Sequence, residues 1–175
     1  FDCQNGRIVS VRTPEGKIFA ETVILSAGVW SRTLLKLLDL TLPVDSVRAS
    51  AMVTQPCPPL IRGPVTDGTF FSRKDHGQQH VFLGAIQAAG GSLIIAQANR
   101  DGSGGDTRVD WQDLSRVGNL FLSHFPRASQ LQIVRSWSGL TPSSADGMPF
   151  WGFGKNFENL FLATAFKGAY SLSPA

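Results

Sequence analysis

The sequence contains no run of about 18 apolar residues, so it predicts no membrane-spanning helix. It also shows no signal peptide and no initiator methionine. Its first residue, Phe1, already lies in a stretch with the alternation of a β-strand. At the other end, Ser173-Pro174-Ala175 is not followed by a closing helix. We therefore expect the chain to be a fragment, cut from a longer polypeptide at both ends.

Cysteine is nearly absent, with only Cys3 and Cys57 in 175 residues. Two cysteines far apart in the sequence are typical of reduced thiols in a cytosolic protein, and they do not form a disulfide framework. We expect a cytoplasmic location, and leave open membrane association through a segment outside this sequence.

Motifs for several kinds of chemistry are lacking. No Gly-x-Ser-x-Gly occurs, and the few carboxylates stand mostly in turns, which argues against serine hydrolases and glycosidases. His76 and His80 lie in a Gly/Gln-rich loop and His124 ends a helix, so no metal site is expected. The Gly-x-Gly within Asn99–Asp106 follows no strand in the required frame, and this excludes a phosphate-binding loop.

Charge is modest: 16 Lys and Arg against 13 Asp and Glu give a net charge of +3. The basic residues are scattered and are not interleaved with aromatics. Nucleic-acid binding is therefore not indicated.

What is present is an ordinary globular composition, with 42% hydrophobic and 17% charged residues, long enough for a real core. Alternation and turn residues predict a hairpin over residues 7–20. The apolar run Thr22–Gly28 predicts a strand buried on both faces, of the kind found in parallel sheets. Ser31 is expected to cap a helix with an apolar leucine face, and Trp30 to pack as its staple.

From Pro43 onward the pattern changes to a meander of mostly antiparallel strands, expected over these ranges: 44–54, 69–72, 80–86, 92–96 and 131–137. Residues 99–106 are expected to form a flexible loop. Asp110 should cap a helix that runs to about Ser123, ends before Pro126 and buries Trp111, Leu114, Val117, Phe121 and Phe125. A further short buried strand is expected over Asn159–Thr164.

The segment Arg135–Gly152 is the most unusual part of the chain. It begins as a strand, and Gly139, Pro142, Asp146-Gly147 and Pro149 then predict a double turn. Two interpretations remain open: a tight, well-packed turn, or a glycine-rich backbone shaped to lie against a flat ligand.

Three separated motifs together resemble one family. They are Val23-Ile-Leu-Ser-Ala-Gly-Val-Trp-Ser31, the segment Arg135–Gly152, and Asn159-Leu-Phe-Leu-Ala-Thr-Ala-Phe-Lys-Gly-Ala-Tyr-Ser-Leu-Ser-Pro-Ala175. Their order and spacing are similar to those of FAD-dependent amino-acid oxidases and dehydrogenases, the group that includes glycine oxidase, sarcosine oxidase, D-amino-acid dehydrogenase and hydrogen cyanide synthase.

The resemblance implies an α+β fold with a discontinuous FAD-binding α/β domain, residues 1–42 and 138–175, and an inserted substrate domain of mixed or antiparallel sheet, residues 43–137. It also implies that an N-terminal Gly-x-Gly-x-x-Gly segment, which holds the FAD pyrophosphate, lies upstream, so the chain alone should not hold FAD tightly. The activity implied is oxidation of the C–N bond of an amino acid or amine by hydride transfer to flavin. A homo- or hetero-oligomer is compatible with the group.

The same resemblance implies site residues. Candidates near the cofactor are Ala27, Gly28, Trp30, Gly139, Ala165, Phe166, Lys167, Gly168, Ala169, Tyr170 and Ser171. Candidates for the substrate are Lys167, Arg48, Arg135 and Thr141. For Arg48 the alternative is a solvent-facing strand-edge residue, and for Arg135 a structural ion pair. Phe70, Phe71 and Phe82 line the substrate pocket or belong to the core, and Asp146 forms a turn.

The chain departs from the family pattern in ways that bear on activity. Thr141 stands where many members have arginine, Thr164-Ala165 replaces Gly-His, and Ala169 replaces a glycine. Lys167 aligns with an arginine and offers a point charge instead of a bidentate fork. An alternative hypothesis is therefore a non-catalytic, flavoprotein-like subunit or scaffold that serves binding or assembly.

Overall fold

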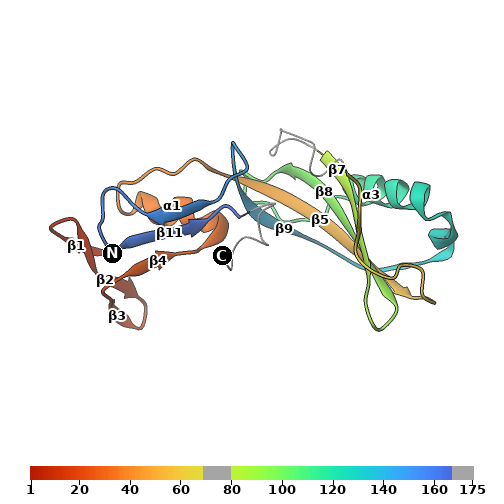
Figure 1. The fold of residues 1–175 in the computed structure, drawn as a ribbon, viewed down its shortest axis with the longest axis horizontal. Helices are drawn as coiled ribbons and strands as arrows, with labels where there is room; N and C mark the ends of the chain where they lie inside the picture. The colour runs from red at the N-terminus through yellow and green to blue at the C-terminus, as the bar shows by residue number, and fades with distance from the viewer. Residues whose placement is uncertain (69–79, 167–175) are drawn as a thin grey trace. The chain divides into compact units, whose positions relative to one another are not determined.

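The computed structural model describes residues 1–68 and 80–166 (Figure 1). It divides into two compact units, one formed by Phe1–Asp45 and Thr141–Ala175, the other by Ser46–Leu140. The chain passes between the units within two strands, β5 (Val44–Pro56) and β9 (Ile133–Ser144). The mixture of sheets and a few helices confirms the predicted α+β class, while the assignment of the units to cofactor and substrate stays a prediction. No helix among the described residues is long and apolar enough to cross a membrane.

The first unit opens with a small antiparallel sheet. Its strands are β1 (Asp2–Gln4), β2 (Arg7–Thr13) and β3 (Gly16–Phe19), in that order. The predicted hairpin is confirmed, because β2 pairs with β3 from Ser10–Phe19 to Thr13–Gly16.

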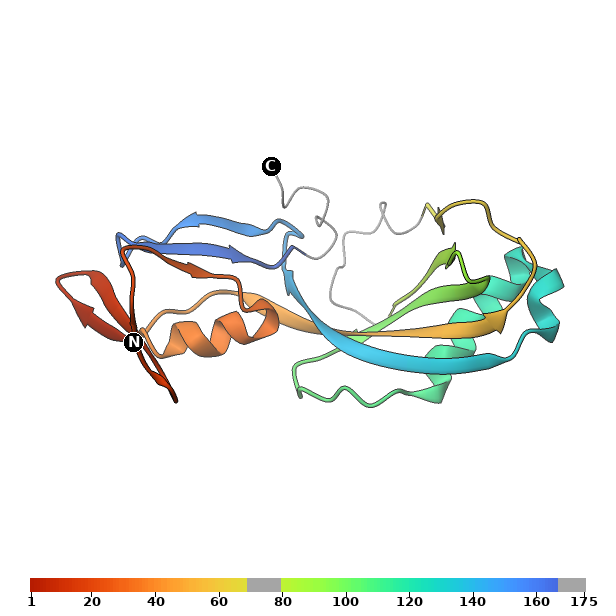
Figure 2. The ribbon, with the colours of Figure 1, turned by 90° about the horizontal axis from the view of Figure 1, so that it is seen from below.

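A second sheet of the first unit is built from segments far apart in the sequence (Figure 2). Strand β11 (Leu160–Thr164) runs parallel to β4 (Val23–Leu25) and antiparallel to β10 (Phe150–Phe153). Leu25 and Leu160 on one face pack into a core with Ile8, Leu35 and Leu38.

The other face of this sheet carries exposed apolar side chains. Ile24 is 65% exposed, so the prediction that this strand is buried on both faces is wrong for the described residues. Ile24 is paired with Phe161 of β11, which in turn is paired with Phe153 of β10. The Trp151 ring packs edge-on against the Phe161 ring, with 5.0 Å between the ring centres. Alternate residues of a strand face opposite sides, so a one-sided core exposes every second residue.

Helix α1 (Ser31–Lys36) follows the short 3-10 turn η1 (Gly28–Trp30). The predicted cap at Ser31 is wrong, because the helix begins there, Trp30 is the N-cap residue and no side chain caps the helix. Trp30 is mostly exposed and is no staple, whereas Leu35 and Leu38 form the buried face. The Ser31 hydroxyl instead donates to Thr164 Oγ1, 3.1 Å away, which links the helix to the end of β11.

The second unit is a five-stranded sheet in the order β6 (Val65–Thr66), β7 (His80–Gln87), β8 (Ser92–Asp101), β5 and β9. The pairings of β6 with β7, of β7 with β8 and of β8 with β5 are all antiparallel, which confirms the predicted meander for the described strands. The strand predicted over residues 69–72 lies outside the described residues. The loop predicted from Asn99 begins later, because Asn99 and Arg100 still pair with Ala49 and Arg48.

Helix α3 (Trp111–His124) packs against β7 and β8 and is followed by the 3-10 turn η2 (Pro126–Gln130). Asp110 caps it as predicted, accepting a hydrogen bond from the Gln112 N–H at 2.9 Å. Val117 and Phe121 enter the core with Leu93 and Ile95. Trp111 was predicted to be buried but is 73% exposed, because the first turn of α3 extends beyond that core.

Strand β9 continues through Gly139 and Pro142 to Ser144, so the first of the two predicted turns does not exist. The second turn is confirmed at Asp146-Gly147. Gly147 has φ +74°, the Asp146 carboxylate accepts from the Met148 N–H at 3.0 Å, and the Ser144 hydroxyl donates to the Met148 carbonyl. Pro142 is tolerated within β9 because this strand lies at the edge of the described sheet.

We expect Asn159→Ala to destabilise the first unit by about 3 kcal/mol, because each buried polar group left unpaired costs about 1–3 kcal/mol. The buried Asn159 amide donates to the carbonyls of Ile8 and Glu21 and accepts from the Ile8 N–H at 2.9 Å. Urea unfolding of the variant measures the change. The exposed neighbour Asn156→Ala serves as control and should stay within about 0.5 kcal/mol of wild type; an equal loss in both would contradict the prediction.

We expect Asp110→Ala to lower the free energy of unfolding by about 1 kcal/mol through loss of the helix cap. Asp110→Asn separates the cap from the ion pair with Arg100, 3.0 Å away, because asparagine keeps the acceptor oxygen and loses the charge. Asp110→Asn should therefore retain most of the stability. Equal losses in the two variants would show that the ion pair matters more than the cap.

Candidate functional site

The candidate site of the first unit lies where two parallel strands end. Because β4 and β11 run parallel, their carboxyl ends meet at one edge of the sheet. Ala27 and Gly28 follow β4, and Ala165 and Phe166 follow β11. This edge is where open α/β sheets bind nucleotide-type ligands.

A buried chain of hydrogen bonds fastens the two strand ends together. Thr164 Oγ1 donates to the Gly28 carbonyl at 3.2 Å and accepts from the Ser31 hydroxyl at 3.1 Å. Ser31 and Thr164 are both buried, so these bonds are shielded from water. Sequence reasoning assigned Ser31 to a helix cap and missed this pairing, since no local pattern links residues so distant in the chain.

The backbone at this edge is unusual at two positions. Gly28 has φ +58° and Ala165 has φ +64°. The left-handed conformation is free for glycine but costs an L-residue such as Ala165 about 1–2 kcal/mol. Ala165 is fully buried, so packing holds it there. Strain of this kind clusters at ligand sites, and small side chains allow the main chain to approach a ligand closely.

Five of the predicted cofactor residues gather around this edge. Ala27 and Gly28 follow β4, Trp30 ends η1, and Ala165 and Phe166 follow β11; the Phe166 ring stacks edge-on against Trp151 at 5.9 Å. Gly139 lies in β9 of the second unit. Lys167, Gly168, Ala169, Tyr170 and Ser171 lie outside the described residues.

Among the predicted substrate residues, Thr141 belongs to the first unit, is half-buried and lies in β9. Arg135 lies in β9 of the second unit, with its guanidinium 5.9 Å from the centre of the Trp137 ring, and is exposed. Their roles in substrate binding stay predictions, as does that of Lys167. Phe82 is buried in the second unit, whereas Phe70 and Phe71 lie outside the described residues.

Arg48 has a competing structural role. It stands on β5 opposite Arg100 of β8, and its side chain contacts Asp106 at 3.2 Å and Asp113 at 4.0 Å. Arg100 donates to the same Asp113 at 2.7 Å, and Asp113 is only 1% exposed. Buried charges persist when they are paired, so the two arginines neutralise the Asp113 carboxylate on α3. The side chain of Arg48 is thus not solvent-facing, and its role in substrate binding stays a prediction.

No group of His, Cys, Asp and Glu that could hold a metal ion exists among the described residues.

Comparison with known proteins identifies the family. The model of the family described as FAD dependent oxidoreductase matches residues 1–175. The chain belongs to this FAD-dependent oxidoreductase family. Its members use FAD as cofactor.

Individual relatives support the same family assignment. The chain is 30% identical to a glycine oxidase of Pseudomonas aeruginosa, over 97% of this chain and 43% of that protein. It is 28% identical to sarcosine oxidase subunit beta of Rhizobium meliloti, over 98% of this chain and 39% of that protein. The structure superposes on that of glycine oxidase from Geobacillus kaustophilus with a TM-score of 0.79 at 25% identity, covering 94% of this chain and 41% of that one. The chain thus spans less than half the length of these relatives.

We expect the Asp106 carboxylate to stabilise the second unit in a pH-dependent way. Hydrogen bonds from Arg108, with the nearby Arg48, lower the pKa of Asp106 from 3.8 to about 2. Because the folded-state pKa lies below the unfolded one, the stabilisation is present in full above pH 3.8 and is lost as the pH falls toward about 2. The difference in unfolding free energy between wild type and Asp106→Asn should shrink across that range; a constant difference would contradict the assignment.

Proposed function

We propose that this chain is part of an FAD-dependent oxidoreductase that oxidises the C–N bond of an amino acid or related amine by hydride transfer to flavin. The observation that carries the proposal is the joined edge of β4 and β11, where the family-matching segments around Gly28 and Ala165 meet. Relatives named glycine oxidase and sarcosine oxidase subunit beta support the substrate class.

The residues present fit a flat cofactor at this edge. Gly28 has open space where a Cβ would lie, and Ala165 brings only a methyl group. Gly28 therefore lets the main chain lie close to a ring system. FAD, when bound, accepts the hydride that leaves the substrate carbon.

The role left to the chain is to position the substrate. Lys167 follows the β11 edge directly in sequence, and its ammonium group is suited to the carboxylate of an amino acid. Thr141 offers a neutral hydroxyl where many members carry a second cation. Because one lysine replaces two arginines that can each bind a carboxylate through two hydrogen bonds, we expect a lower affinity for the substrate carboxylate than in arginine-bearing members.

We further propose that the chain works as a fragment of a longer polypeptide. The exposed apolar face of sheet β10–β11–β4, with Ile24, Trp151 and Phe153, supports this, because a sheet of this kind needs cover on both faces. The 175 residues alone should bind no flavin; stoichiometric FAD in this chain would contradict the fragment proposal.

A second candidate is a non-catalytic subunit, favoured by the departures at Thr141, Ala165 and Ala169. One relative is itself named a subunit, sarcosine oxidase subunit beta. The absence of bound flavin in the longest polypeptide that the gene encodes would favour this candidate.

For the catalytic proposal we expect that polypeptide to be yellow and to bleach anaerobically with glycine, sarcosine or a D-amino acid. Lys167→Met should raise KM about tenfold or more, since a hydrogen bond to a charged group contributes about 1.5–3 kcal/mol and 1.4 kcal/mol is tenfold. Lys167→Arg, which keeps the charge, should retain or lower KM. Equal KM values in the wild type and both variants would show that Lys167 does not bind the substrate carboxylate.

A further inference from the structure

The turn between β1 and β2 carries the dipeptide Asn5-Gly6, which the proposed chemistry does not use. The chain has five asparagines, and only Asn5 is followed by glycine. Strand β1 pairs with β2 up to Gln4 and Arg7, so Asn5 and Gly6 alone form the turn. Both residues are exposed, with φ +48° and +72°, as a two-residue hairpin turn requires.

The two groups of this dipeptide that can react with each other are free. Neither the Asn5 side-chain amide nor the Gly6 N–H has a hydrogen-bond partner among residues 1–68 and 80–166. Glycine has no Cβ, so its nitrogen can approach the preceding side chain with little steric hindrance. Strand β1 has three residues, none of them fully buried, and local opening is easiest where the backbone is exposed. The turn can therefore open far enough for the two groups to meet.

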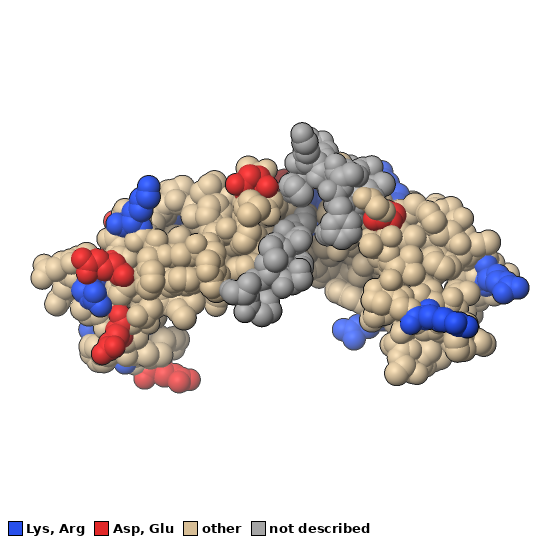
Figure 3. Space-filling model, in the orientation of Figure 1, with Lys and Arg blue, Asp and Glu red and all other residues tan. Residues whose placement is uncertain are grey.

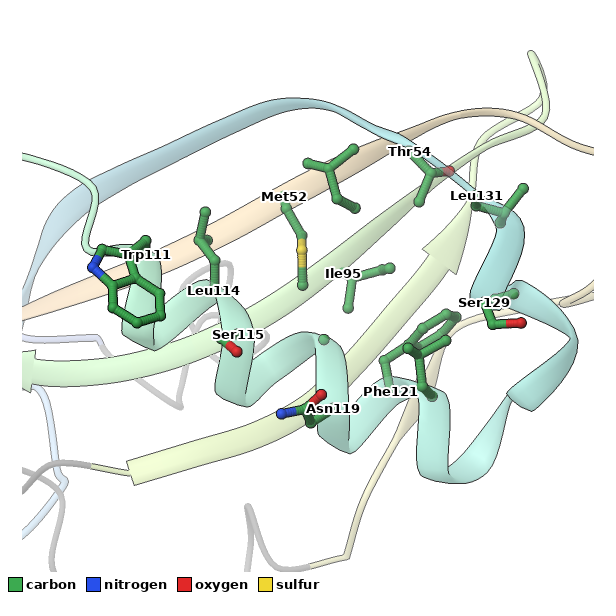
Figure 4. A pocket seen from close by; sticks show the side chains of 14 residues that line it. Met52, Thr54, Ile95, Trp111, Leu114, Ser115, Asn119, Phe121, Ser129 and Leu131 are labelled. Atoms are coloured by element: carbon green, nitrogen blue, oxygen red, sulfur yellow. The ribbon is translucent and has the colours of Figure 1, made fainter.

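An exposed asparagine of the second unit shows the protection that this turn lacks. Asn119 lies on helix α3, beside an apolar groove of about 370 Å³ between that helix and the start of β9 (Figure 4). Inside a helix the following N–H is bonded to a carbonyl four residues back, and the backbone is fixed. Leu120, which follows Asn119, also brings a branched side chain.

Two Asp-Gly pairs, which could undergo a related reaction, are blocked at the glycine nitrogen. In Asp101-Gly102 the glycine N–H donates to the Ser46 carbonyl at 2.8 Å. In Asp146-Gly147 the glycine N–H donates to the Ser144 carbonyl at 3.2 Å. Asn5-Gly6 differs from both pairs in its free nitrogen and in its neutral amide, which is a better electrophile than an ionised carboxylate.

We propose that Asn5 is a site of spontaneous deamidation, and that its isoaspartyl product loosens the start of β11. The Gly6 nitrogen gives its proton to hydroxide and attacks the carbonyl carbon of the Asn5 side chain. The bond from that carbon to the amide nitrogen breaks, and ammonia leaves with a proton taken from water. Water then opens the succinimide ring at one of its two carbonyls, which gives aspartate or isoaspartate. The sum is amide plus water to carboxylic acid plus ammonia, and nothing is oxidised or reduced.

The turn is joined to the residue that anchors β11. The Gly6 carbonyl accepts from the Glu158 N–H at 3.1 Å, and the next residue, Asn159, donates to the Ile8 carbonyl. Isoaspartate adds one methylene group to the main chain directly before Gly6, so this carbonyl is displaced from the Glu158 N–H.

The new carboxylate by itself should matter little. The first unit, on the left in Figure 3, shows Lys and Arg beside Asp and Glu, so the charge enters a surface of mixed sign. Exposed charges contribute little to stability. The effect of the modification therefore comes from the altered main chain.

The test follows deamidation in the longest polypeptide that the gene encodes, kept at mildly alkaline pH. Mass spectrometry of proteolytic peptides measures the rate at each asparagine, and methylation by an isoaspartyl methyltransferase detects isoaspartate. Asn156 is the matched control: it is exposed, its carbonyl oxygen lies 3.9 Å from where a Cβ of Gly6 would stand, and Phe157 follows it. We expect Asn5 to react at least tenfold faster than Asn156, and Asn5→Gln to abolish the isoaspartate signal. Equal rates at the two asparagines would overturn the proposal.

The same incubation in urea separates the fold from the sequence. Because an exposed turn opens at little cost, Asn5 should react in the folded protein within about tenfold of its rate in the unfolded chain. Stronger protection by the fold would show that the hairpin holds the dipeptide closed, and would refute the site.

Urea unfolding of the separated products tests the second part of the proposal. Asn5→Asp, which adds the charge alone, should unfold at the same urea concentration as wild type, whereas the isoaspartyl form should unfold at a lower one. Conversion of isoaspartate to aspartate by the methyltransferase should restore the wild-type midpoint. An isoaspartyl form as stable as wild type would exclude any loosening of β11. These measurements need no flavin, so their outcome is independent of the proposed function.

Discussion

The parallel pairing of β4 with β11 is the contact on which the first unit depends. It joins residues 23–25 to residues 160–162, and buried polar side chains hold it at both ends. Asn159 ties the start of β11 to Ile8 and Glu21, while Thr164 ties its end to Gly28 and Ser31. Without this pairing the segments around Gly28 and Ala165 would have no common edge, and the proposed cofactor site depends on that edge.

The second unit depends on a different device, a charged junction between helix and sheet. Arg48 and Arg100, facing each other on β5 and β8, both reach the buried Asp113 of α3. Pairing in a poorly solvated place is worth more than at the surface and fixes the helix in one register. The junction holds one end of α3, and the groove between α3 and β9 remains beside it.

Patterns in the chain predicted much of this architecture. The alternation of apolar and polar residues predicted the hairpin of β2 and β3, and the Asp110 cap predicted the start of α3. Both predictions succeeded because these signals act between residues that are near neighbours in the sequence. The same local reasoning failed where burial depends on distant partners. Trp111 fits the apolar period of α3 yet is exposed, and β9 passes through Gly139 and Pro142 because an edge strand tolerates what a central strand excludes.

The sequence by itself determined the family and hence the cofactor, since the motifs around Gly28, Arg135–Gly152 and Leu160–Ala165 keep their order and residue types. Only the tertiary structure decided which side chains are available. It placed Ser31 on Thr164 instead of at a helix cap, engaged Arg48 with Asp106 and Asp113, and left Arg135 exposed. The physical reason is that these side chains meet partners far away in the chain, 58 residues for Arg48 and Asp106 and 133 residues for Ser31 and Thr164, which no local pattern encodes.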